Sequence, residues 1–156
     1  MAVVVIGVGN DVRGDDAAGL LVVRRLRDSE LRSRVALVTH EGDAIGLLEL
    51  WDGADAAVLV DAVCSGAGAG TVHRIDASRA GLPADWSGAS SHAISAAESI
   101  ELARVLGTLP RRVIVYGVEG ACFEQGAPLS DDVAAALPKL ADAVRAEALA
   151  LHCSTA

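Results

Sequence analysis

Acidic residues and one histidine recur where predicted strands end and helices begin. Asp15 and Asp16 follow the first apolar run of the chain, Glu41 follows the second, Asp61 closes the third, and His92 begins a predicted helix. In open α/β sheets, ligands bind outside the carboxyl ends of the strands, where these side chains should gather. Two carboxylates and one imidazole suit Zn, Ni, Mn or Fe(II), and a set of three ligands leaves positions open for water or substrate.

Each of these residues also has an ordinary structural interpretation. Asp15 or Asp16 can cap the first helix, Asp61 can fix the loop after its strand, and His92 can be a first-turn residue without a ligand role. Adjacent residues on a helix face apart, so we expect only one of the two aspartates to be a ligand. Helix periodicity does not say which one.

The strands that must position these residues are nearly continuous apolar runs, which are typical of parallel strands covered on both faces. Four such runs are expected at 2–8, 34–39, 56–61 and 112–118. A weaker fifth strand is expected at 70–75. Because the loop 62–69 is too short for a parallel crossover, this strand should run antiparallel.

Helical periodicity fills the gaps between the strands. Helices are expected over 16–28, 44–51 and 93–106, and the C-terminal segment should form a short helix followed by a longer one with Pro138 in its first turn. The sequence therefore predicts an α/β three-layer sandwich, with helices on both faces of a five-stranded, mostly parallel, twisted sheet and one antiparallel edge strand.

Composition limits the functional classes. At 156 residues we expect one domain over 1–156, and the size suits a monomer. The formal net charge of -8 argues against nucleic acid or an anionic membrane as a partner. No apolar run is long enough to span a membrane, no signal peptide is visible, and the three cysteines form no paired motif. These features favour a cytoplasmic protein.

A dinucleotide site is the competing interpretation of the glycine-rich loop. Gly7 and Gly9 after the first strand, with Glu41 after the second, imitate such a site. However, the third glycine would have to stand at Val12, and Gly14 comes two positions late. Carboxylates at the start of the helix would also repel a phosphate, so we expect no nucleotide cofactor.

Taken in order, several motifs resemble one family over nearly the whole chain, the nickel-iron hydrogenase maturation endopeptidases. The matching residues are Gly7-Val8-Gly9-Asn10 with Asp15-Asp16 and Gly19, Val60-Asp61-Ala62, Ser91-His92, Gly117-Val118, Gly126, Leu129-Ser130 and Pro138. The resemblance implies an endopeptidase that removes the C-terminal extension of a hydrogenase large-subunit precursor. It also implies that cleavage follows nickel insertion.

The resemblance places the metal-contacting residues at Asp16, Asp61 and His92, and the metal would be the nickel already loaded in the precursor. It thereby selects Asp16 over Asp15. Some members have Glu where Asp16 stands. The segment Glu41-Gly42-Asp43-Ala44 also departs from the Asp-Gly-Gly-Thr that other members often have, which weakens any role carried over to Glu41. Glu41 and Asp15 are the candidates for a general base.

Two other functional classes fit the same three ligands. One is a metal-sensing checkpoint or chaperone for the same precursor, which binds it without cleaving it. The other is a metallopeptidase or amidase with its own permanent metal. The mass of the precursor after incubation separates the first from a protease, and metal analysis of the purified protein separates the second.

Overall fold

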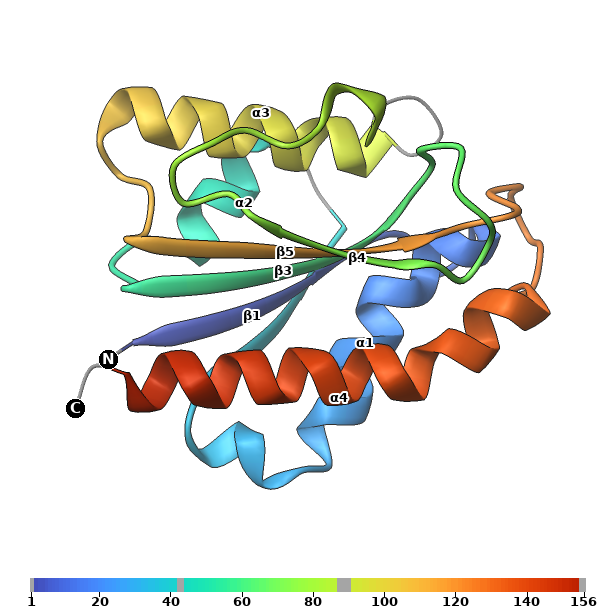
Figure 1. Ribbon diagram of the computed structural model, residues 1–156, viewed down its shortest axis with the longest axis horizontal. Coiled ribbons are helices and arrows are strands. Elements are labelled where there is room, and N and C mark those ends of the chain that lie inside the picture. Colours follow the sequence, from blue (N-terminus) through green and yellow to red (C-terminus); the bar gives the residue numbers. More distant parts are fainter. Residues whose placement is uncertain (1, 42–43, 87–90, 155–156) are drawn as a thin grey trace.

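The computed structural model describes residues 2–41, 44–86 and 91–154, and the side chains of residues 44 and 91–95 lie outside this description. The strands form one five-stranded sheet in the spatial order β2-β1-β3-β5-β4 (Figure 1). Their bounds are Val3–Val8 for β1, Ala36–His40 for β2, Ala56–Val63 for β3, Val72–Asp76 for β4 and Arg112–Glu119 for β5.

The pairing of the strands follows the lengths of the connections. β1 pairs in parallel with β2 and β3, and β3 pairs in parallel with β5. β4 runs antiparallel to β5 at the edge of the sheet, which confirms the prediction from the short loop before it. The carboxyl ends of β1, β2, β3 and β5 therefore lie together along the border of the sheet where these strands end. The carboxyl end of β4 lies along the opposite border, where the parallel strands begin.

Helices cover both faces of the sheet, as predicted. Helices α1 (Ala18–Arg27) and α4 (Asp131–Cys153) pack together on one face, and α2 (Ala44–Leu50) and α3 (Ser91–Leu106) pack together on the other (Figure 1). Every residue of β1 and β3 is buried, because helices cover these central strands from both sides. The two aliphatic cores between the layers remove this apolar surface from water and stabilise the fold.

The prediction that all four long strands are buried is wrong for β2. Ala36 is exposed and the rest of β2 is half-buried. The physical reason is its place in the sheet, since β2 is an edge strand that pairs only with β1. An apolar run alone does not distinguish a central strand from an edge strand.

The predicted break before Pro138 is also wrong, because α4 continues through this residue over 23 residues. A proline inside a helix removes one hydrogen bond and destabilises the helix by about 3 kcal/mol. Val133 before it and Leu140 after it are fully buried against the sheet, and packing on both sides holds the helix together. None of the described helices, α4 included, combines the length and hydrophobicity that crossing a membrane requires.

Candidate functional site

Glycines bring the start of α1 directly against the ends of the strands. A Cβ atom on Gly7 would lie 2.2 Å from the carbonyl oxygen of Gly19, and one on Gly19 would lie 2.2 Å from that of Val60. A Cβ on Gly9 would lie 1.9 Å from the carbonyl oxygen of Asp16. Close packing of backbone on backbone thus explains the glycines at the end of β1 and at the start of α1. This packing fixes the position of Asp16 above the ends of β1 and β3.

Asp16 and Asp61 form a buried acidic pair at the carboxyl end of the sheet. Asp16 is completely buried, and the guanidinium of Arg13 lies 3.9 Å from its Oδ2 atom. Asp61, near the end of β3, is 3% exposed and its Oδ1 accepts a hydrogen bond of 2.8 Å from the amide of Ala62. Its Oδ2 atom has no hydrogen-bond donor among the described residues.

The surroundings of Asp61 oppose its negative charge. Burial raises the pKa of Asp61 well above its usual range, the nearby Asp16 carboxylate raises it further, and the bond from the Ala62 amide only partly opposes this. A buried carboxyl with a neighbouring like charge takes up a proton or attracts a cation. Within the pair, Asp61 is therefore the carboxyl that favours a proton or a cation.

Asp61 also lines a small cavity between the sheet and α3. Its other walls are apolar and include Val8 of β1, Ala96 of α3 and Trp86 of the short helix η3 (Ala84–Trp86). The volume of about 10 Å³ is roughly the room that one water molecule needs. This apolar lining is why burial dominates the pKa of the carboxyl.

Asp15, the neighbour of Asp16, points to different partners. It lies in the short helix η1 (Gly14–Ala17) and accepts hydrogen bonds from the amides of Ala121 (2.7 Å) and Cys122 (3.1 Å). It also accepts bonds from the amide (2.7 Å) and hydroxyl (2.9 Å) of Ser130. Burial raises the pKa of Asp15, but the bonds from Ser130, Ala121 and Cys122 outweigh it and hold the pKa below its usual value.

The expected helix-capping role is wrong for Asp15 and Asp16. The N-cap of α1 is Ala17, and no side chain caps that helix end. Asp15 instead fixes the loop between β5 and α4 onto the start of α1. A carboxylate that accepts so many hydrogen bonds is a weak base, which argues against Asp15 as the general base.

The other predicted site residues are not joined to the acidic pair by any described contact. Glu41 directly follows β2 and is exposed, and it makes no described contact with Asp16 or Asp61. His92 lies in the first turn of α3, but its side chain is outside the described part of the structure. Among the side chains that are described, no three of His, Cys, Asp or Glu lie together as a metal site. The three-ligand set therefore stays a prediction.

Sequence reasoning missed a polar cluster around Glu119. This residue ends β5, is 1% exposed and accepts hydrogen bonds from the amide (3.0 Å) and hydroxyl of Ser65. Its Oε1 atom also lies 3.1 Å from Nε2 of His73, whose ring contacts Trp86. His73 lies in β4, within the strand expected at 70–75. In the antiparallel register His73 lies opposite Gly117, and Glu119 follows two residues later on the same strand. This register is the signal that indicates the contact between His73 and Glu119.

Comparisons with known proteins identify a family and a set of similar structures. The family model described as hydrogenase maturation protease (HycI) matches residues 21–147, a range that contains Asp61 and His92 but not Asp16. No curated protein matches the sequence. Solved structures do resemble it, beginning with an endopeptidase from Escherichia coli at 24% identity and a TM-score of 0.85, which covers 98% of this chain and 94% of the other.

Two further solved structures are similar over nearly their whole length. The hydrogenase maturating endopeptidase HybD from Escherichia coli has 22% identity and a TM-score of 0.74, with 94% of this chain and 91% of that chain covered. The [NiFe] hydrogenase maturation protease HybD from Thermococcus kodakarensis has 24% identity and a TM-score of 0.72, with 95% and 99% covered. Because the identities are 22% and 24%, the similarity to these structures establishes the fold alone.

Proposed function

This chain belongs to the hydrogenase maturation protease family, and from that premise we propose that it removes the C-terminal extension of a nickel-iron hydrogenase large-subunit precursor. We propose further that cleavage depends on nickel already present in the precursor. The observation that carries the second step is the buried acidic pair, Asp16 and Asp61. The burial of Asp61 beside Asp16 disfavours its negative charge, so this arrangement supports a role in function rather than in stability.

The donor set fits a divalent metal ion of the substrate. Oδ2 of Asp61 is buried without a hydrogen-bond donor among the described residues, so a cation would satisfy it. Asp16 supplies a second carboxylate, and His92 is proposed as the third ligand. Carboxylate oxygens with an imidazole nitrogen are within the range that nickel accepts.

In this proposal the residues of the chain recognise the loaded precursor and position its scissile bond. A metal ion bound there supplies Lewis acidity toward the scissile carbonyl. Asp16, Asp61 and His92 hold the precursor through the metal, so an unloaded precursor is not positioned. Glu41, which is exposed directly after β2, the strand that pairs with β1, takes the proton of the attacking water as general base.

The test compares the intact mass of a large-subunit precursor before and after incubation with this protein. Loss of a C-terminal peptide is expected from the nickel-loaded precursor and not from the nickel-free one. Asp16→Asn, Asp61→Asn and His92→Ala should abolish cleavage while the proteins stay folded. Asp28→Asn, the same chemical change at an exposed position at the end of α1, is the matched control and should cleave normally.

Other outcomes would assign a different function. Binding of the nickel-loaded precursor without a mass change would identify a non-catalytic checkpoint. Stoichiometric metal that purifies with this protein would identify an enzyme with its own permanent metal. Normal cleavage by the Asp16→Asn or His92→Ala protein would disprove the proposed site.

A further inference from the structure

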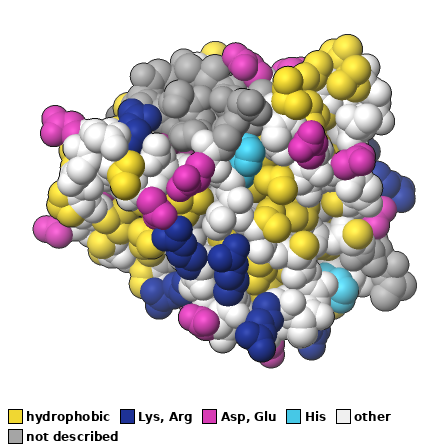
Figure 2. Space-filling view, turned by 180° about the vertical axis from the view of Figure 1, so that it is seen from behind, with side chains coloured by type: hydrophobic (Ala, Val, Ile, Leu, Met, Phe, Trp, Pro, Cys, Tyr) yellow, Lys and Arg dark blue, Asp and Glu magenta, His cyan; other side chains and the backbone are white. Residues whose placement is uncertain are grey.

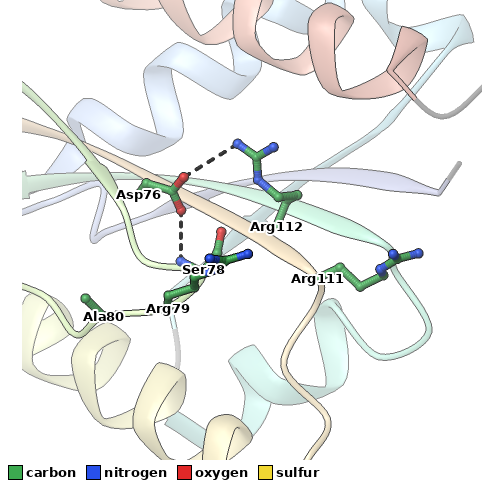
Figure 3. Close-up of a pocket in the computed structure, with 6 residues that line it drawn as sticks. All are labelled: Asp76, Ser78, Arg79, Ala80, Arg111 and Arg112. Atoms are coloured by element: carbon green, nitrogen blue, oxygen red, sulfur yellow. Dashed lines mark hydrogen bonds and ion pairs between the residues drawn. The ribbon is translucent and has the colours of Figure 1, made fainter.

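A pocket rich in arginine lies at the border of the sheet where the parallel strands begin, opposite the candidate site at their carboxyl ends. It is formed where β4 ends and β5 begins, and it has a volume of about 430 Å³ (Figure 3). We call it the arginine pocket, and its lining residues are Asp76, Ser78, Arg79, Ala80, Arg111 and Arg112. The eight residues of β5 separate it from Glu119 by roughly 25 Å, so it is not part of the site at the other edge.

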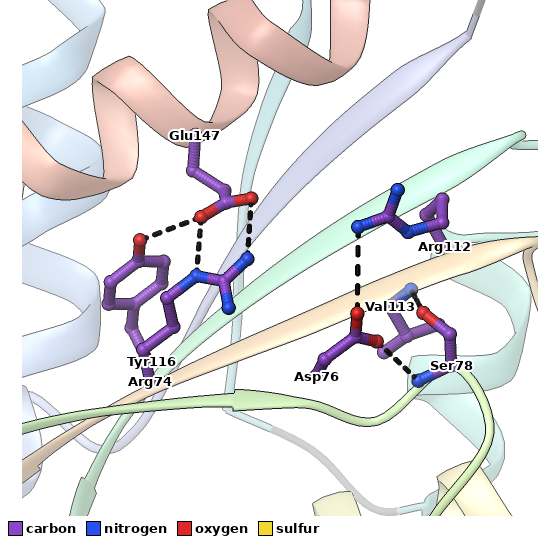
Figure 4. A network of polar contacts seen from close by, with 7 residues as sticks. All are labelled: Arg74, Asp76, Ser78, Arg112, Val113, Tyr116 and Glu147. Atoms are coloured by element: carbon purple, nitrogen blue, oxygen red, sulfur yellow. Dashed lines mark hydrogen bonds and ion pairs between the residues drawn. The ribbon is translucent and has the colours of Figure 1, made fainter. Parts of the chain in front are cut away.

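The wall of the arginine pocket is held in place by hydrogen bonds. Arg104 of α3 donates to the carbonyl oxygens of Ala77 (3.0 Å), Ser78 (3.0 Å) and Ala80 (3.2 Å). The hydroxyl of Ser78 accepts a bond of 2.9 Å from the amide of Val113 (Figure 4). The backbone that carries Arg79 is therefore fixed before any ligand arrives, which lowers the entropy lost on binding.

The positive charge of the arginine pocket is not balanced. Among its described lining residues Asp76 is the only one with a carboxylate, and that group lies 3.5 Å from the guanidinium of Arg112 and accepts a bond from the amide of Ser78 (Figure 4). Arg79 and Arg111 have no ion pair or side-chain hydrogen bond within the described residues. Counted over the described lining residues, three guanidiniums and one carboxylate leave a surplus of two positive charges in a chain whose net charge is -8.

Arginines also cluster outside the arginine pocket. Lys and Arg side chains gather on the lower part of the face shown in Figure 2. The last turn of α1 carries Arg24, Arg25 and Arg27. Arg24 forms a bidentate pair with Asp11 there. Arg25 is exposed and has no described ion pair, so it provides a matched control for the charge alone.

From this arrangement we infer that the arginine pocket binds a small anion with at least two negative charges, carried by phosphate or clustered carboxylate groups. Guanidinium groups recognise both through paired, charge-assisted hydrogen bonds. The volume lies in the range of small-molecule sites. The anion does not take part in peptide cleavage at the other edge, so this inference is independent of the proposed protease activity.

The test titrates the full chain with pyrophosphate and, separately, with citrate, by calorimetry and by amide NMR shifts. Saturable binding with one ligand per chain is expected, with shifts concentrated at residues 76–80 and 111–113. Arg79→Gln and Arg111→Gln should each weaken binding by about tenfold, because each removes a hydrogen-bonding charge from the ligand. Arg25→Gln should bind like the unmodified protein.

The outcomes separate the sources of the anion and can overturn the inference. Tighter binding of pyrophosphate identifies a phosphate-bearing ligand, and tighter binding of citrate identifies a polycarboxylate. The inference is wrong if neither anion saturates the protein. It is also wrong if Arg25→Gln weakens binding as much as Arg111→Gln, since the effect would then come from overall charge. Circular dichroism of each variant verifies that these exposed substitutions leave the fold intact.

Discussion

Asp15 and Asp61 lie at the same edge of the sheet, and the carboxyl groups of both are buried. Asp15 accepts four hydrogen bonds from Ala121, Cys122 and Ser130, which hold its pKa below the usual value against the effect of burial. Asp61 accepts one, from the neighbouring Ala62 amide, and burial and the charge of Asp16 raise its pKa. The pKa of Asp15 is therefore lowered and that of Asp61 is raised, although neither side chain is exposed to solvent.

The difference separates a carboxylate that serves the fold from one that is available for chemistry. The donors around Asp15 belong to the loop before α4, so its charge joins two distant parts of the chain. The Oδ2 atom of Asp61 has no such donor among the described residues, and its charge destabilises the protein until a cation or a proton arrives. Functional sites commonly retain groups of this kind at a cost in stability.

The largest expected change in stability comes from Asp15→Asn. An amide presents its own donors to the amides of Ala121, Cys122 and Ser130, and the negative charge is lost. The free energy of unfolding should fall by about 3 kcal/mol, which urea denaturation measures.

Ser130→Ala is the matched control for this prediction. It removes only the hydroxyl that bonds to Asp15 and should lower the free energy of unfolding by about 1 kcal/mol. If Asp15→Asn and the unmodified protein unfold at the same urea concentration with equal slopes, the structural role of Asp15 is disproved.

Asp61→Asn should change stability in the opposite direction. The amide carries no charge to bury, keeps an oxygen for the Ala62 amide and offers a donor toward the Asp16 carboxylate. In protein freed of metal by a chelator, the free energy of unfolding at neutral pH should rise by about 1 kcal/mol. Asp28→Asn, at an exposed position, should change it by less than about 0.5 kcal/mol. A destabilised Asp61→Asn protein would contradict the comparison.

The sequence predicted the layers, the mostly parallel sheet and the antiparallel edge strand, because each depends on periodicity and on loop length. It also placed both aspartates at the correct edge. The different roles of Asp15 and Asp61 depend on the loop at 120–130, which joins Asp15 across more than a hundred residues, and no local pattern reports such a contact. The pairing of His73 with Glu119 was missed for the same reason. Pro138 was misjudged because tertiary packing outweighs a local rule.

A third carboxylate, near the surface, extends this comparison, and its loss is expected to change the free energy of unfolding less. Glu147 of α4 accepts bonds of 2.7 and 3.0 Å from Arg74 and one of 2.9 Å from the hydroxyl of Tyr116 (Figure 4). The bonds from Arg74 hold the pKa of Glu147 below its usual value despite partial burial, and the bond from Tyr116 adds to this. Burial and Glu147 raise the pKa of Tyr116 to about 12, so the phenol keeps its proton.

Glu147→Gln should therefore lower the free energy of unfolding at neutral pH by about 1 kcal/mol. Because the pKa of Glu147 is lower in the folded state, its stabilisation is complete above the unfolded value, roughly 4.3, and is lost as the pH falls toward the folded value. The difference between the two proteins should shrink in acid, as urea denaturation at a series of pH values measures. A difference that is constant with pH would show that shape, and not charge, is responsible.

The smallest change in stability is expected for Glu41→Gln. The same substitution should nevertheless strongly lower the cleavage activity. The Glu41 side chain is exposed and makes no described hydrogen bond or ion pair, so Glu41→Gln should change the free energy of unfolding by less than about 0.5 kcal/mol. If Glu41 is the general base, the same substitution lowers the single-turnover rate of precursor cleavage by about a hundredfold or more. Binding of the loaded precursor should not change, because Asp16, Asp61 and His92 are intact. An unchanged cleavage rate would remove Glu41 from the mechanism. Because the hydrogen bonds of Asp15 hold the loop before α4, the acidic pair of Asp16 and Asp61 would then have to activate the attacking water.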